Sequence, residues 1–231
     1  GATIGLSASF SSTDVSGKGT GKAINDIDSY TVSVYADKAT DNGYIEGSLT
    51  YGINDNTTSR IVNTAGLNRA YTAAYDSSQL SLKISAGSPT EVSADTYITP
   101  FGSFTSSSIT TDSYTEKSVT ASDNLRLKVD QDDVSSMIGT IGIKAHKVTD
   151  QGTPMILLAV NNEFGDTKIK NTNTYQGGGS AFKTTTDIEA LSATLGLGYS
   201  FGSEMTSLNI SYETEWNDED YTSTYGSIKI T

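Results

Sequence analysis

The sequence contains no cysteine, only one histidine (His146) and only three prolines in 231 residues. Without cysteine, disulfide frameworks, thiol nucleophiles and cysteine-based metal sites are all excluded. No window approaches 18 consecutive apolar residues, which excludes a transmembrane helix. The formal charge of −12 lacks the basic footprint that a nucleic-acid partner needs. Few chemical functions fit these absences, so the pattern of the remaining residues has to define the class.

The clearest pattern lies in Asp187–Gly202, which reads DIEALSATLGLGYSFG. From Leu191 onward, apolar side chains alternate with serine, threonine and glycine, and a period of two predicts a β-strand. The segment is as long as a tilted strand that crosses a bilayer, about 9–11 residues. One face is apolar and the other is small and polar, which is typical of an outer-membrane barrel strand. Such alternation hides a barrel from hydropathy, so the mean hydropathy of −0.31 fits a membrane barrel and a soluble β-protein equally.

Ten segments of the chain show a strand pattern, and the connections between them alternate between long and short. The predicted strands are Ala2–Ser11, Ser29–Asp37, Tyr44–Gly52, one ending at Gly87, Thr96–Ser106, Val134–Ala145, Pro154–Phe164, Leu191–Gly202, Ser207–Trp216 and Tyr225–Thr231. The long connections are Ser12–Asp28, Ile53–Ala70, Ser107–Asp133 and Thr167–Thr186. Up-and-down membrane barrels sort their loops in this way. We therefore expect residues 1–231 to form one closed, all-antiparallel transmembrane β-barrel; a soluble barrel is the alternative.

Alternation also assigns side chains to the two sides of the predicted wall. The residues expected to point into a polar lumen are Glu46, Lys83, Lys144, Glu213 and Lys229. Lys83 and Lys144 are expected to lie near inward carboxylates, because an unpaired charge there would be unfavourable. The lipid-facing set is Leu191, Leu195, Leu197, Leu208 and Ile210. An aromatic girdle at headgroup depth is expected from Tyr30, Tyr51, Tyr199, Phe201 and Tyr212.

The sequence offers little for catalysis. The one histidine, His146, falls in a predicted short turn, and no acidic residue is placed to form an acid–base pair with it. We predict that the chain is not an enzyme and that it binds neither a cofactor nor a metal.

Four short runs of sequence resemble the autotransporter β-domain, and in particular its rickettsial surface-antigen branch. They are Ile27-Asp28-Ser29-Tyr30, the ten residues from Gly43 to Gly52 (GYIEGSLTYG), Asn162-Glu163-Phe164-Gly165-Asp166 and the eight residues from Leu195 to Gly202 (LGLGYSFG). The resemblance implies a 12-stranded outer-membrane barrel of type V secretion, threaded by a helix that links to an N-terminal passenger. Because Ala2–Ser11 resembles the third strand of the family, the first two strands and the pore helix are expected to be missing here. The chain also ends at Ile230-Thr231, without the terminal aromatic residue that the barrel-assembly machinery reads, so we expect either a fragment trimmed at both ends or a smaller barrel.

The function implied by the resemblance is a translocator in the outer membrane of a Gram-negative bacterium. Its partners would be outer-membrane lipid, its own passenger and linker helix, and the barrel-assembly machinery. Its loops would be extracellular and its turns periplasmic. The alternative is a stand-alone barrel adhesin that binds the host-cell surface through the long loops Ser12–Asp28, Ser107–Asp133 and Thr167–Thr186.

Overall fold

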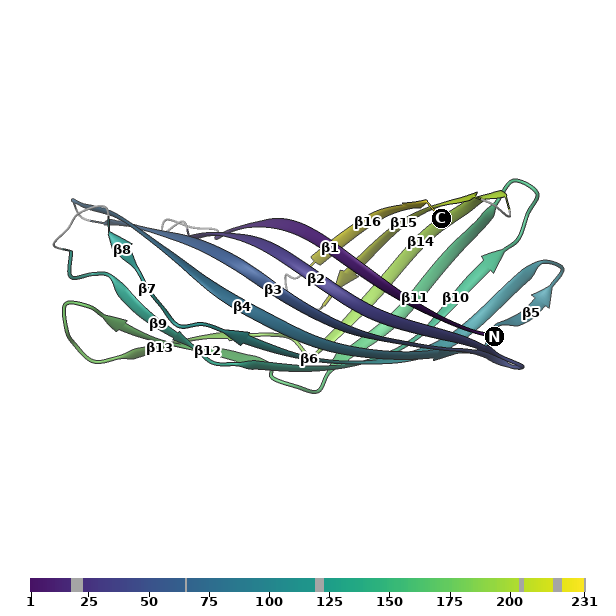
Figure 1. Ribbon diagram of the computed structural model, residues 1–231, viewed down its shortest axis with the longest axis horizontal. Helices are drawn as coiled ribbons and strands as arrows, with labels where there is room; N and C mark the ends of the chain where they lie inside the picture. The colour runs from purple at the N-terminus through teal and green to yellow at the C-terminus, as the bar shows by residue number, and fades with distance from the viewer. Residues whose placement is uncertain (18–22, 65, 119–122, 204–205, 218–221, 231) are drawn as a thin grey trace.

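A computed structural model describes residues 1–17, 23–64, 66–118, 123–203, 206–217 and 222–230. One large antiparallel sheet dominates it, with strand order β1-β2-β3-β4-β6-β10-β11-β14-β15-β16 (Figure 1). Its strands are β1 (Ala2–Ser16), β2 (Ala23–Thr40), β3 (Gly43–Thr64), β4 (Leu67–Gly87), β6 (Thr96–Thr111), β10 (Val134–Lys147), β11 (Thr153–Glu163), β14 (Leu191–Ser203), β15 (Thr206–Trp216) and β16 (Thr222–Ile230). The described segments include no helix long and apolar enough to cross a membrane.

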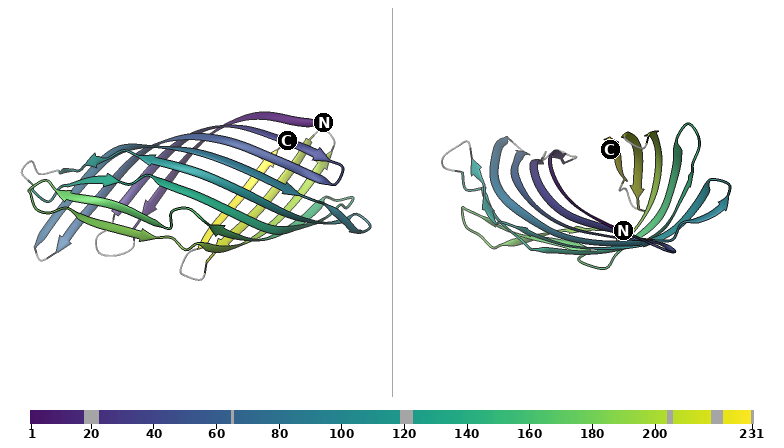
Figure 2. Two further views of the ribbon diagram at one scale, coloured as in Figure 1. Left: turned by 90° about the horizontal axis from the view of Figure 1, so that it is seen from below. Right: turned by 45° about the vertical axis from the view of Figure 1, so that its right-hand side comes forward.

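The ten principal strands are the ten that the alternation predicts. They follow one another across the sheet in the same order as along the chain. This is the up-and-down antiparallel topology expected from the sequence. The sheet curls into a trough (Figure 2). The prediction of closure is wrong for the described residues, because β1 and β16 form the two free edges and do not pair with each other.

Two of the predicted long loops are instead continuations of strands. β3 and β4 remain paired from Tyr44↔Gly87 to Thr64↔Leu67, across most of the segment expected to be a loop. β1 and β2 pair in the same way as far as Ser16↔Ile24. These extensions contain many β-branched residues, which suit strands as well as polar loops. They carry the wall of the trough beyond the predicted membrane span.

The other two long connections form a second, small sheet with strand order β13-β12-β9-β7. Its strands are β7 (Tyr114–Thr115), β9 (Leu127–Gln131), β12 (Lys168–Tyr175) and β13 (Phe182–Asp187). The short β8 (Lys117–Ser118) follows β7 and pairs with β4, so the second sheet lies beside the large sheet. We call this end of the molecule the loop end. The remaining short strand, β5 (Thr90–Ser93), pairs with β6 at the opposite end of the molecule, which we call the turn end (Figure 1).

Candidate functional site: the concave wall

Contacts between strands that are not neighbours identify the concave face of the trough. The Lys144 ammonium lies 5.9 Å from the ring centroid of Tyr44, although β4 and β6 separate their strands. Across β14, the side-chain amide of Asn161 in β11 donates to Glu215 in β15 at 3.2 Å. Only the inside of a curled sheet brings side chains from second- and third-neighbour strands so close. Strand pairing then assigns every other residue to this concave face or to the opposite, convex face.

Hydroxyl pairs run along much of the concave face. The side chains of Ser33 and Thr50 share a hydrogen bond of 2.7 Å, and Ser107 donates to Ser81 at 2.8 Å. Thr140 donates to the side-chain Oδ1 of Asn161 at 2.8 Å, and the hydroxyl oxygens of Ser211 and Ser227 are 2.8 Å apart. Each pair joins adjacent strands through short side chains. The result is a surface that is polar but carries little bulk.

Glycines on this face receive aromatic rings from the neighbouring strand. A Cβ built on Gly142 would lie 2.6 Å from the Phe101 ring, and one built on Gly87 would lie 2.7 Å from the Tyr44 ring. The rings therefore lie flat against the wall instead of projecting from it. Lys144 sits over Phe101, with its nitrogen 4.8 Å from the ring centroid. This cation–π contact replaces the carboxylate partner predicted for Lys144.

An acidic hollow of about 620 Å³ lies where the concave face meets the loop end. It is lined by Ile138, Asn161, Glu163, Asp187, Ile188, Glu189, Ala190, Ser192, Glu215 and Asn217. Glu215 accepts hydrogen bonds from Ser192 and Asn161, and Glu163 accepts from the Ser136 hydroxyl at 2.5 Å and from the Met137 N–H at 2.6 Å. Neutral donors thus satisfy both carboxylates, which fixes them in place without neutralising them.

The register places all five predicted lumen residues on the concave face. Glu46 stands opposite Ser85, Lys83 opposite Ser48 and Thr105, and Lys144 opposite Thr99. Glu213 stands opposite Tyr225, and Lys229 opposite Asn209. The predicted carboxylate partners are a different matter: among the described residues neither Lys83 nor Lys144 forms an ion pair. Both cations stay solvated or lie over rings, because an open trough does not force them to pair. That these side chains line a transport path stays a prediction.

The ten residues assigned to lipid and to the girdle all fall on the convex face. Leu197 stands opposite Tyr212 and Ile210 opposite Tyr199 on one surface, where their side chains are about half exposed. The ring centroids of Tyr199 and Phe201 are 5.9 Å apart near the turn end, and those of Phe10 and Tyr30 are 5.2 Å apart on the loop side. Phe10 belongs with Tyr30 in the pattern but was not in the predicted girdle. Contact with lipid stays a prediction for all of these residues.

The phase of β11, which the apolar run MILLAV leaves open, is fixed by its neighbours. Met155 and Leu157 stand opposite Gly198 and Gly196 on the concave face, where the glycines leave room for them. Ile156 and Leu158 point to the convex face.

His146 was predicted to lie in a turn, but β10 runs through it, and its ring stacks on Tyr97 with centroids 5.0 Å apart.

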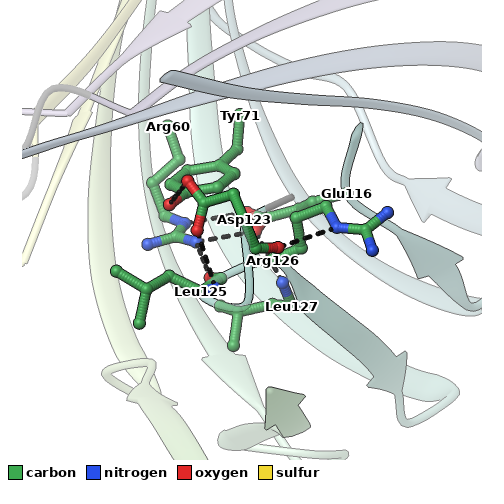
Figure 3. Close-up of polar contacts among 7 residues, drawn as sticks. All are labelled: Arg60, Tyr71, Glu116, Asp123, Leu125, Arg126 and Leu127. Carbon is green, nitrogen blue, oxygen red and sulfur yellow. Dashed lines mark hydrogen bonds and ion pairs between the residues drawn. The ribbon is translucent and has the colours of Figure 1, made fainter. Parts of the chain in front are cut away.

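A buried ionic cluster at the loop end was missed by the sequence reasoning (Figure 3). Arg60 donates to both carboxylate oxygens of Glu116, at 2.8 and 2.6 Å, and also to the Leu125 carbonyl at 3.1 Å. Glu116 in turn accepts from the Leu127 N–H at 2.7 Å. The Arg60 guanidinium lies 4.5 Å above the ring of Tyr71, which is completely buried. These contacts clamp the β6–β10 connection onto the β3–β4 hairpin.

Asp123 completes the cluster by binding the hydroxyl of Tyr71, whereas Arg60 lies over the ring. It accepts from the Leu125 N–H at 2.9 Å and from the Tyr71 hydroxyl at 2.7 Å, and it pairs with Arg69 at 3.2 Å. The Leu125 N–H and the Tyr71 hydroxyl hold the pKa of Asp123 below its ordinary value. Burial, together with the bond to Asp123, raises the pKa of Tyr71 to about 12. The one available signal was the alternation of Tyr71, Ala73 and Tyr75, which continues the β4 pattern into the predicted loop.

Comparison with known proteins gives a consistent result. The family model described as "Autotransporter beta-domain" matches residues 1–213. The translocator domain of autotransporter NalP from Neisseria meningitidis superposes with a TM-score of 0.69 at 17% identity, covering 98% of this chain and 74% of that one. The β domain of the Bordetella autotransporter BrkA gives a TM-score of 0.57 at 17% identity, covering 98% and 89%. No curated protein matches the sequence significantly. The two structural likenesses show a shared fold.

Proposed function

Because this chain belongs to the autotransporter β-domain family, we propose that it anchors in the outer membrane of a Gram-negative bacterium and translocates and displays a passenger fused upstream of Gly1. The observation that carries this proposal is the part of the concave wall between the turn end and the loop-end cluster, where pairs of short hydroxyl side chains join the strands and the described lysines form no ion pair. Small hydroxyl side chains can solvate a moving polypeptide without binding any one sequence tightly.

Such a barrel requires closure, and we propose that two strands and a helix upstream of residue 1 supply it. The backbone groups along the free edges of β1 and β16 would be unsatisfied in hydrocarbon, at several kcal/mol each. The chain covers 74% of the NalP translocator domain, so about a quarter of that domain has no counterpart in residues 1–231. We further propose extracellular loops, periplasmic turns and insertion by the barrel-assembly machinery.

Bulky side chains placed on the concave wall test translocation. In the full-length protein, Thr50→Trp with Ser81→Trp puts two large rings at facing positions of β3 and β4 on the concave face. The matched control is Leu49→Trp with Leu82→Trp, one residue along on the convex face. We expect the concave pair to slow exposure of the passenger to external protease, while heat-modifiable mobility shows that the barrel still folds. The convex pair should leave passenger exposure unchanged. Equal exposure in both pairs would contradict a translocation path along this wall.

The second candidate function, a stand-alone adhesin, draws support from the ordered second sheet. β12 and β13 form a paired hairpin, with Asn173 donating to Thr184 at 3.1 Å, and ordered loops are better suited to binding than to passive linkage. Replacing residues 168–187 with a short glycine-serine linker separates the two functions. Loss of host-cell adhesion while heat-modifiable mobility shows a folded barrel would favour the adhesin, whereas unchanged adhesion would argue against it.

A further inference from the structure

Among the described residues, most of the positive charge at the loop end lies on the outward face of the second sheet and of the adjoining β8. Glu116 contacts Arg60, and Tyr114 stacks on Tyr75 at 4.6 Å, so these residues of the β7–β8 segment share the concave side. Alternation sends the intervening residues of this segment, and those of the strands paired with it, to the convex side. The lysines placed there are Lys117, Lys128, Lys168, Lys170 and Lys183, and all five are exposed.

We call these five residues the lysine face. They form a third of the 15 Lys and Arg residues in a chain whose net charge is −12. Three acidic residues share the convex side of this sheet. Asp187 pairs with Lys168 at 2.5 Å, Asp130 pairs with Lys128 at 3.0 Å, and Asp132 stands opposite Lys170 at the end of β9. Among the described residues, Lys117, Lys170 and Lys183 have no ion-pair partner. A basic surface therefore interrupts an otherwise acidic protein.

Two of the unpaired lysines lie close enough to bind one anionic group. Lys170 in β12 stands opposite Thr185 in β13, and Lys183 stands opposite Thr172. The two lysines are therefore diagonal neighbours, about 7–8 Å apart between Cα atoms. Flexible lysine side chains at this spacing can direct two ammonium groups at adjacent oxygens of a phosphate.

The lysine face also begins close to the apolar surface of the trough. Phe164, whose side chain is 64% exposed, covers Gly139 on the convex face at the loop end of β11. Lys168 follows only four residues later, no more than about 13 Å along an extended chain. The polar layer of a bilayer adds about 5–8 Å on each side of the hydrocarbon core. Lys168 can therefore reach the headgroups when the apolar band spans the membrane, and the rest of the lysine face continues outward from it.

We propose that the lysine face binds net-anionic phosphate headgroups of the outer leaflet, holding the loop-end sheet against the membrane beside the barrel mouth. This inference rests on the membrane placement given under the proposed function. Lipid is favoured over a soluble anion because the face points away from the lumen, on the same convex side as the apolar band. Each lysine near an anionic membrane surface increases binding about fivefold.

A single fluorescent label tests this proposal, since the chain has no native cysteine. Thr185→Cys places the label on the exposed convex side of β13, opposite Lys170. The full-length protein is folded into phosphatidylcholine vesicles that contain either phosphatidylglycerol or phosphatidylcholine with a nitroxide on the headgroup. We expect stronger quenching by the phosphatidylglycerol probe. The preference should fall about fivefold for each lysine removed in Lys170→Gln and Lys183→Gln.

Two controls give each outcome one meaning. Lys38→Gln with Lys147→Gln removes two exposed lysines from the turn end and should leave the preference at Thr185→Cys intact. A label at Leu197→Cys, quenched by tail-labelled lipid, reports insertion of the barrel independently. Quenching at Leu197→Cys without any headgroup preference at Thr185→Cys would overturn the lysine-face proposal and leave the translocator standing. Absence of quenching at Leu197→Cys would overturn the membrane placement itself. Equal binding of soluble heparin without lipid preference would overturn the assignment to lipid.

Discussion

The concave face of the trough and the ionic cluster at the loop end are both built on β-strands, but they treat charged side chains in opposite ways. Along the concave face of the trough, charged side chains such as Lys83 stay unpaired, and hydroxyl pairs such as Ser33 with Thr50 join neighbouring strands. At the loop end, Arg60, Glu116 and Asp123 are bound by several groups each, and Tyr71 is fully buried. The first arrangement leaves a passable surface, and the second fixes a long connection. Rigidity is concentrated where the chain leaves the sheet and avoided where we propose that a passenger moves.

The largest expected effect comes from breaking the buried pair at the loop end. Glu116→Ala leaves Arg60 without its carboxylate and the Leu127 N–H without its acceptor. Removing one partner of a buried pair destabilises by about 3–5 kcal/mol, confined here to the clamped connection. Hydrogen exchange of residues 123–131 should rise accordingly. Lys168→Gln, which removes a pair whose side chains are 63% and 66% exposed, should leave hydrogen exchange nearly unchanged, because water already screens that pair. Equal effects of the two changes would remove the contrast between buried and exposed pairs.

The sequence predicted the spanning strands better than the loop-end cluster, and the reason is physical. In Leu191–Gly202 a strict period of two reports two different solvents, so the pattern encodes both the strand and its sidedness. Arg60, Glu116 and Asp123 lie in polar segments where pairing depends on contacts between residues more than 50 positions apart. No local pattern encodes such contacts. Closure failed as a prediction for a related reason, since it depends on partners for β1 and β16 that strand periodicity does not specify.

The next largest effect tests the convex face. Leu197→Arg places a charge in the middle of the apolar band, where we expect a loss of about 2–4 kcal/mol of folding free energy in a bilayer. Thr194→Arg puts the same charge on the concave face of the same strand, opposite Glu215, and should be tolerated. Urea-induced unfolding of both variants in lipid vesicles measures the difference. Comparable losses in the two variants would mean that the faces do not meet different solvents.

A smaller effect is expected where a ring lies against a glycine. A Cβ at Gly142 would lie 2.6 Å from both the Phe101 ring and the Leu158 carbonyl oxygen, and the backbone atom cannot move away cheaply. Gly142→Ala should therefore destabilise the sheet by about 1–3 kcal/mol. The matched control is Gly47→Ala, whose Cβ meets nothing closer than 3.8 Å. Thermal unfolding followed by heat-modifiable mobility compares them, and a larger loss at Gly47 would contradict the crowding argument.

The last effect is a pH dependence of the loop-end cluster, which we call the clamp. It is absent at neutral pH and appears only when Tyr71 or Asp123 titrates. Because the pKa of Tyr71 is raised from 10.0 to about 12 in the folded protein, its contribution to stability is complete below pH 10 and is lost as the pH rises toward 12. The lowered pKa of Asp123 acts in the opposite direction, so its contribution is complete above its ordinary pKa of 3.8 and is lost as the pH falls through the lower folded value. Between these limits the clamp should show no pH dependence from either group.

The difference in tyrosinate absorbance between the parent protein and Tyr71→Phe isolates the titration of Tyr71. Asp123→Asn should move it back toward 10, because the carboxylate no longer opposes ionisation of the hydroxyl that it binds. A difference curve already centred near 10 in the parent protein would mean that Tyr71 is not held in the buried cluster. It would contradict the view that the loop end is more rigid than the concave wall.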